Sequence, residues 1–155
     1  MSSNIKKQLF IYLLLLSFFS IFHLEIKSSV GNDSTISEWF INYTGGFTKR
    51  GIIGQISIFF SRLFSSDLRE IIFYFQSITI LVYYLLIFNF LKNVKCDRIF
   101  LLAIFTPIFL LYPVAEIEVL ARKETFLFII ILIYLAIPIK NKNLINTAKL
   151  TLLPL

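Results

Sequence analysis

The chain has few of the residues that ordinary soluble enzymes and disulfide frameworks are built from. Only 15% of its 155 residues are charged, and it contains five glycines, four prolines, one histidine and one cysteine. A lone Cys96 excludes a disulfide scaffold, and His23 has no second histidine with which to form a zinc site. Walker A, G-x-S-x-G and H-E-x-x-H motifs are absent from the sequence. Common soluble enzyme classes are therefore disfavoured.

Apolar residues are correspondingly abundant. Hydrophobic residues make up 57% of the chain, against about 45–50% in soluble proteins. Ile, Leu and Phe account for 69 of the 155 residues. So much apolar mass excludes a disordered chain and indicates an integral membrane protein.

Charge-free runs locate the expected spans. They cover residues 8–24, 71–91, 99–115 and 125–139, and none of them alternates between polar and apolar residues as a membrane strand would. A bilayer core about 30 Å thick needs about 20 helical residues. The sequence therefore predicts an all-α polytopic membrane protein with four transmembrane helices at about 8–24, 70–91, 99–115 and 124–139.

A single long helix over 99–139 is the alternative to the last two spans. It would place the charged cluster 116–124 at the bilayer centre, where each charge costs several kcal/mol. Two spans joined at this cluster avoid that cost. The apolar end of the chain, 144–155, resembles the start of a further span, which raises the expectation of a truncated part of a longer protein.

Basic residues favour a topology with both termini in the cytoplasm. The inner segments then carry a charge of +7 and the outer segments −1, which gives the net charge of +6. The composition, rich in Ile, Phe, Lys and Asn, is typical of an AT-rich bacterial genome, so we expect a bacterial inner membrane protein. No basic run with interleaved surface aromatics indicates a nucleic-acid partner. The first run could also be a signal peptide, but bulky residues follow it where a small-x-small cleavage site is expected.

The outer loop 25–69 contains the first candidate site. Its acids Asp33 and Glu38 precede a glycine-rich stretch in which Lys49 and Arg50 stand beside Gly51. Basic residues at glycines can form an anion-binding turn; a flexible connector is the alternative. Residues 52–64 then predict an amphipathic helix along the membrane surface, with Ile52, Ile56, Phe59, Phe60 and Leu63 on one face. A fifth, buried span remains the alternative for this helix.

The outer turn at 112–125 contains the second candidate site. Five charges occur within nine positions: Glu116, Glu118, Arg122, Lys123 and Glu124. A salt-bridged start of the next helix accounts for them without a ligand. Alternatively, Arg122 and Lys123 contact a phosphate while Glu116 or Glu118 binds a metal or acts as a base.

Two segments, TGGFTKRGIIG at 44–54 and ARKE at 121–124, give the chain a layout that resembles a known group of proteins. It is similar to the N-terminal part of bacterial polytopic proteins of cell-surface polysaccharide assembly, including polymerase-like proteins and GT-C-type glycosyltransferases. The resemblance implies that Asp33 or Glu38 is a catalytic or metal-binding acid, and that Lys49, Arg50, Arg122 and Lys123 hold a lipid-linked phosphate. A divalent cation is expected only under this interpretation.

Two functions therefore remain open at the level of sequence. The first is a fragment or small member of an envelope glycan assembly system that binds a polyprenyl-phosphate-linked sugar at the outer face. The second is a non-enzymatic membrane subunit that packs with other helices in a complex, which the small size and the lack of paired acids favour. A transporter is disfavoured because the expected spans contain no internal charges.

Overall fold

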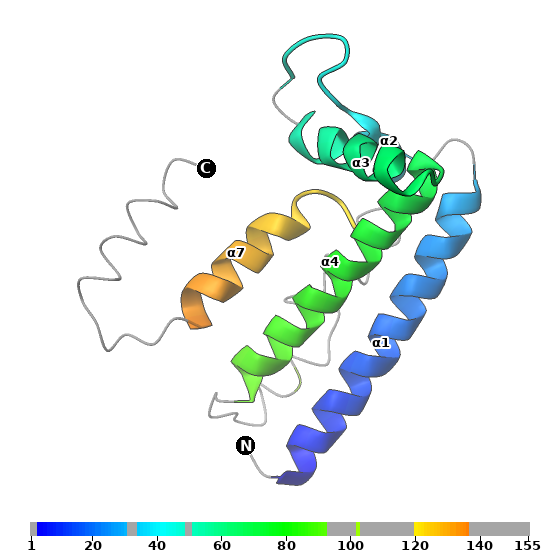
Figure 1. Ribbon diagram of the computed structural model, residues 1–155. Coiled ribbons are helices and arrows are strands. Elements are labelled where there is room, and N and C mark those ends of the chain that lie inside the picture. Colours follow the sequence, from blue (N-terminus) through cyan, green and yellow to red (C-terminus); the bar gives the residue numbers. More distant parts are fainter. Residues whose placement is uncertain (1–2, 31–33, 49–50, 93–101, 103–119, 137–155) are drawn as a thin grey trace, which may run out of the picture.

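The computed structural model describes residues 3–30, 34–48, 51–92, 102 and 120–136 (Figure 1). Within these residues every regular element is an α-helix, as the sequence predicts. The helices are α1 (Ser3–Ser29), α2 (Ser34–Phe40), α3 (Gly51–Phe64), α4 (Leu68–Leu91) and α7 (Thr125–Ala136).

Two of these helices, α1 and α4, are long and apolar enough to cross a membrane. Their 27 and 24 residues correspond to about 40 and 36 Å at 1.5 Å per residue, more than the roughly 30 Å of a bilayer core. They match the predicted spans at 8–24 and 70–91. The helix α1 extends further than predicted at both ends because Lys6, Lys7, Glu25 and Lys27 are accommodated within it.

The two long helices pack side by side and antiparallel (Figure 1). At one end the rings of Phe10 and Phe88 meet edge to face with centroids 5.4 Å apart. Further along, the buried Ser20 hydroxyl is 3.0 Å from the Tyr84 hydroxyl. At the other end the Arg69 guanidinium donates to the Ser28 carbonyl at 3.0 Å. These contacts fix the register of α1 against α4.

The third packed helix, α7, lies along α4 and buries Ile129 and Leu132 in the core that α1 and α4 share. It covers residues 125–136 of the predicted fourth span at 124–139, and the remainder of that span after Ala136 lies outside the described residues. The predicted third span at 99–115 lies outside the described residues, apart from Leu102. Within the described residues the structure therefore shows two helices of membrane-spanning length, and four spans are not shown.

The predicted surface helix at 52–64 is present as α3, which lies across the end of α4 where that helix begins (Figure 1). Ser65 ends α3 in the left-handed conformation (φ 52°), and the Ser66 N–H donates to the Ser61 carbonyl at 3.2 Å. This is the hydrogen bond of a Schellman motif. Asp67 then caps α4 by accepting from the Arg69 N–H at 3.5 Å.

The buried face of α3 is made of small residues. Gly51, Gly54 and Ser57 point inward, whereas the large apolar side chains are exposed: Ile52, Ile56, Phe59, Leu63 and Phe64. The remaining predicted face residue, Phe60, packs on Phe75 of α4 with ring centroids 5.6 Å apart. Gly51 and Gly54 therefore lie inside a helix, and the interpretation of this stretch as a flexible connector does not apply to them.

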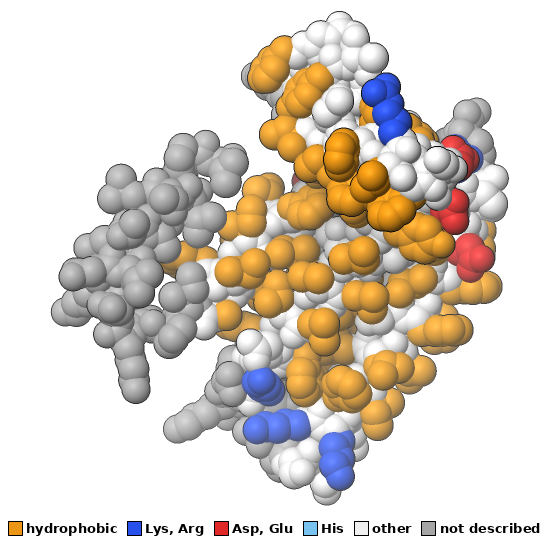
Figure 2. All heavy atoms as spheres, viewed as in Figure 1, with side chains coloured by type: hydrophobic (Ala, Val, Ile, Leu, Met, Phe, Trp, Pro, Cys, Tyr) orange, Lys and Arg blue, Asp and Glu red, His pale blue; other side chains and the backbone are white. Residues whose placement is uncertain are grey.

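Apolar side chains also cover the outside of the long helices, as Figure 2 shows. Among the residues that the structure describes, charged side chains lie only towards the two ends of the helix pair. Where α1 begins and α4 ends, the described charged residues are Lys6, Lys7 and Lys92. Further basic residues lie towards the opposite end. All described acids lie there too: Glu25, Glu38, Asp67, Glu70 and Glu124. The charge-free middle and the segregated ends agree with the predicted pattern.

Candidate functional site

The short helix α2 and the turn before α7 meet at the end of the molecule that carries the acids. The indole of Trp39 on α2 is fully buried, and it packs with Ile36 and with Ile72 of α4. Phe126 of α7 lies against the same ring, with centroids 5.7 Å apart. Trp39 thus joins three helices.

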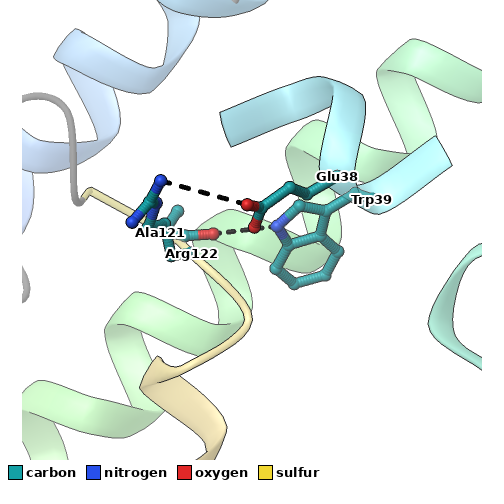
Figure 3. A network of polar contacts seen from close by, with 4 residues as sticks. All are labelled: Glu38, Trp39, Ala121 and Arg122. Atoms are coloured by element: carbon teal, nitrogen blue, oxygen red, sulfur yellow. Dashed lines mark hydrogen bonds and ion pairs between the residues drawn. The ribbon is translucent and has the colours of Figure 1, made fainter. Parts of the chain in front are cut away.

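A hydrogen bond connects α2 directly to the turn. The indole N–H of Trp39 donates to the carbonyl of Ala121 at 2.9 Å, 82 positions along the chain (Figure 3). Ala121 is fully buried and has a left-handed backbone with φ 59°. Because such a conformation costs a residue with a Cβ about 1–2 kcal/mol, the contacts around Ala121 must hold it. The Trp39 hydrogen bond satisfies a carbonyl that is otherwise costly to bury.

Two charged side chains flank this hydrogen bond. The Glu38 carboxylate and the Arg122 guanidinium approach to 4.0 Å between Oε1 and Nη2 (Figure 3). The Glu38 side chain is 22% exposed and that of Arg122 is 40% exposed. The pair therefore lies at the edge of the packed region, and the guanidinium is open to a ligand from outside.

The pair is not saturated by hydrogen bonds. Among the described residues, Glu38 Oε2, Arg122 Nε and the neighbouring Thr125 Oγ1 are buried atoms without a hydrogen-bond partner. Buried polar atoms in native proteins are nearly always paired, with protein, water or a bound group. They are a carboxylate acceptor, a guanidinium donor and a hydroxyl whose hydrogen bonding the described residues do not satisfy.

The structure brings together one predicted residue from each candidate site, Glu38 and Arg122. Lys123 is adjacent to Arg122 in the same turn and is partly buried. The other predicted site residues lie outside the described part of the chain: Asp33, Lys49, Arg50, Glu116 and Glu118.

Trp39, Ala121 and Thr125 belong to the same arrangement, and sequence reasoning did not assign them to the site. Trp39 is the single tryptophan of the chain, and this was the only feature of the sequence that could have drawn attention to it. Ala121 begins the ARKE segment but has no functional side chain, and nothing in the sequence marks Thr125. Within the described ranges, no three His, Cys, Asp or Glu residues lie close enough together to hold a metal ion.

Comparison with protein-family models, curated proteins and solved structures finds no match to this chain. The class of protein is therefore described from its fold and its site alone. In its described part the protein is all-helical, with two helices of membrane-spanning length and composition. At one end, α2 and the turn before α7 form a charged pair over a buried tryptophan.

Proposed function

We propose that the protein is an integral component of a bacterial inner membrane that serves envelope glycan assembly. In this proposal Arg122 holds the phosphate of a polyprenyl-phosphate-linked sugar at the outer face, and Glu38 contacts the sugar next to it. The convergence of these two residues from opposite halves of the chain, with polar atoms left unpaired, is the observation that carries the proposal.

Charge placement supports the membrane orientation. With both termini in the cytoplasm, eight lysines and arginines fall on the inner segments and seven on the outer ones. Five of those seven lie in the long loop 25–69, and long loops cross the membrane largely regardless of charge. Basic residues next to membrane spans remain in the cytoplasm. Both long helices have charge-free middles, and a bilayer covers their exposed apolar surface. The Glu38–Arg122 end is then on the outer side.

The chemistry of the pair supports a phosphate ligand. An arginine guanidinium presents several N–H donors in a plane and can bind two phosphate oxygens at once. Arg122 is partly exposed and its Nε is unpaired, so it retains donors for such a contact. Glu38 Oε2 can accept a hydrogen bond from a sugar hydroxyl next to the phosphate. The layout that resembles polysaccharide assembly proteins supports the choice of a polyprenyl carrier.

Binding of polyprenyl phosphate to the purified full chain in nanodiscs tests this proposal, with the neutral polyprenol as control ligand. Hydrogen bonds to charged groups contribute about 1.5–3 kcal/mol, so we expect Arg122→Gln to weaken binding about 10- to 100-fold. Arg62→Gln is the matched control, because Arg62 is an exposed arginine on α3 at the same end. Equal binding of phosphate and polyprenol, or equal effects of the two substitutions, would overturn the proposal.

A non-enzymatic subunit of a helical membrane complex is the second candidate. The surface of α7 favours it, because five large apolar side chains are exposed along 12 residues: Leu127, Phe128, Ile131, Ile133 and Leu135. A neighbouring membrane helix would fit this surface. Cysteine introduced at Ile131 in a Cys96→Ser background should then crosslink to one defined protein in native membranes. Only lipid-dependent or random adducts would count against a dedicated partner.

A further inference from the structure

A groove lies at the basic end of the molecule, opposite the Glu38–Arg122 pair. It has a volume of about 410 Å³ and is lined by Ser3, Lys6, Lys7, Phe10, Ile11 and Phe88. The rings of Phe10 and Phe88, in edge-to-face contact at 5.4 Å, line it where α1 and α4 meet. The cavity is therefore built at the junction of the two long helices.

The lining has two chemically distinct parts. Lys6 and Lys7 are exposed and bring two positive charges, and no acid is present among the lining residues. Phe10, Ile11 and Phe88 supply an apolar wall, and Phe10 and Ile11 are about half exposed. An amphipathic anion fits this combination, whereas a small inorganic anion would leave the apolar wall uncovered.

We propose that this groove binds one anionic phospholipid, with the lipid phosphate at Lys6 and Lys7 and an acyl chain along Phe10, Ile11 and Phe88. The proposal rests on the membrane placement given under the proposed function, and adds a second lipid site at the opposite face. Because the lysines flank the wall at the start of α1, the headgroup would lie at the cytoplasmic surface while the chain follows the helices into the bilayer.

Native mass spectrometry of the full chain in neutral detergent tests the site, with phosphatidylglycerol titrated against phosphatidylcholine. A lysine near an anionic lipid surface contributes enough for about a five-fold change in affinity. We therefore expect one retained phosphatidylglycerol, and about 25-fold weaker binding in the double variant Lys6→Gln/Lys7→Gln. Ile11→Ser should weaken binding about threefold or more without disturbing the fold, because this side chain is exposed.

Lys92→Gln is the matched control. Lys92 has the same charge and lies at the same end, but it does not line the groove. Unchanged binding in this variant supports a defined site, whereas an equal loss in Lys92→Gln and Lys6→Gln would show diffuse attraction and overturn the proposal. Competition by inorganic phosphate at the concentration of the lipid would also overturn it.

This outcome is separable from the proposed function. A chain that is extracted from membranes by alkaline carbonate refutes the membrane placement itself. A chain that resists extraction but retains no phosphatidylglycerol refutes only the groove. Arg122→Gln should leave phosphatidylglycerol retention unchanged, because Arg122 lies at the other end of the molecule.

Discussion

Gly54 brings α3 into direct contact with the backbone that follows α2. A Cβ added at this position would meet the carbonyl group of Ile41, with the carbonyl carbon at 2.7 Å, and would lie 3.0 Å from the Trp39 carbonyl oxygen. All of these atoms belong to the main chain, so no side-chain rotation can relieve the overlap. Gly54→Ala must therefore push α3 away from α2.

Two opposing effects set the size of the change. Alanine is a better helix former than glycine by about 1 kcal/mol, and this stabilises α3. Overpacking typically costs about 1–3 kcal/mol, and contact with rigid backbone places Gly54 at the upper end of this range. We expect a net decrease of about 2 kcal/mol in the free energy of unfolding.

The chain contains its own probe for this measurement. Trp39 is the only tryptophan; it is buried, and its carbonyl is one of the groups that the new methyl would contact. Titration with SDS in mixed micelles, followed by Trp39 fluorescence, should show an earlier transition in Gly54→Ala. Gly45→Ala is the control, because a Cβ there has no atom within 4 Å. A Gly54→Ala protein as stable as wild type, or more stable, would refute the close approach of α3.

Three further substitutions test the polar contacts of the fold. Trp39→Phe leaves the buried carbonyl of Ala121 without its donor, and should cost about 1–3 kcal/mol in SDS titrations followed by circular dichroism; unchanged stability would contradict the hydrogen bond. Ser20→Ala and Tyr84→Phe break the contact between α1 and α4, and a double-mutant cycle should give a coupling of about 0.6 kcal/mol, whereas additive effects would argue against it. Gln76→Leu should stabilise the protein by about 1 kcal/mol in the same titration, because the buried Gln76 amide nitrogen has no hydrogen-bond partner in the described part of the chain; a loss of stability would reveal a partner.

Charge-free runs predicted the long helices because the penalty for burying charge in a bilayer acts on local sequence. The second run, 71–91, begins three residues after the start of α4 and ends at the same residue as the helix. The first run underestimated α1, because helix ends are set by capping and not by the first charge encountered. Lys6 and Glu25 are simply included in the helix.

Elements that depend on distant contacts were less accessible from sequence. The helix α2 has only seven residues, too few for a periodic pattern. It contains Trp39, whose hydrogen-bond partner lies 82 positions away. Sequence reasoning identified Glu38 and Arg122 separately, from local charge and residue type. Their approach to 4.0 Å follows from how α2 and the turn before α7 pack on α4, which no local signal encodes.

The composition of α3 bears on the depth at which the proposed phosphate site would lie. A helix with glycines inward and large apolar side chains outward would be unfavourable in water, where such patches are rarely left uncovered. At a membrane surface the same helix buries its exposed face in the headgroup and acyl boundary. Because Gly54 joins α3 to the backbone just after α2, an in-plane α3 places Glu38 at headgroup depth, where a lipid phosphate lies. Gly54→Ala should then weaken polyprenyl phosphate binding and leave the distant phosphatidylglycerol site unaffected; equal losses at both sites would show that α3 does not set this depth.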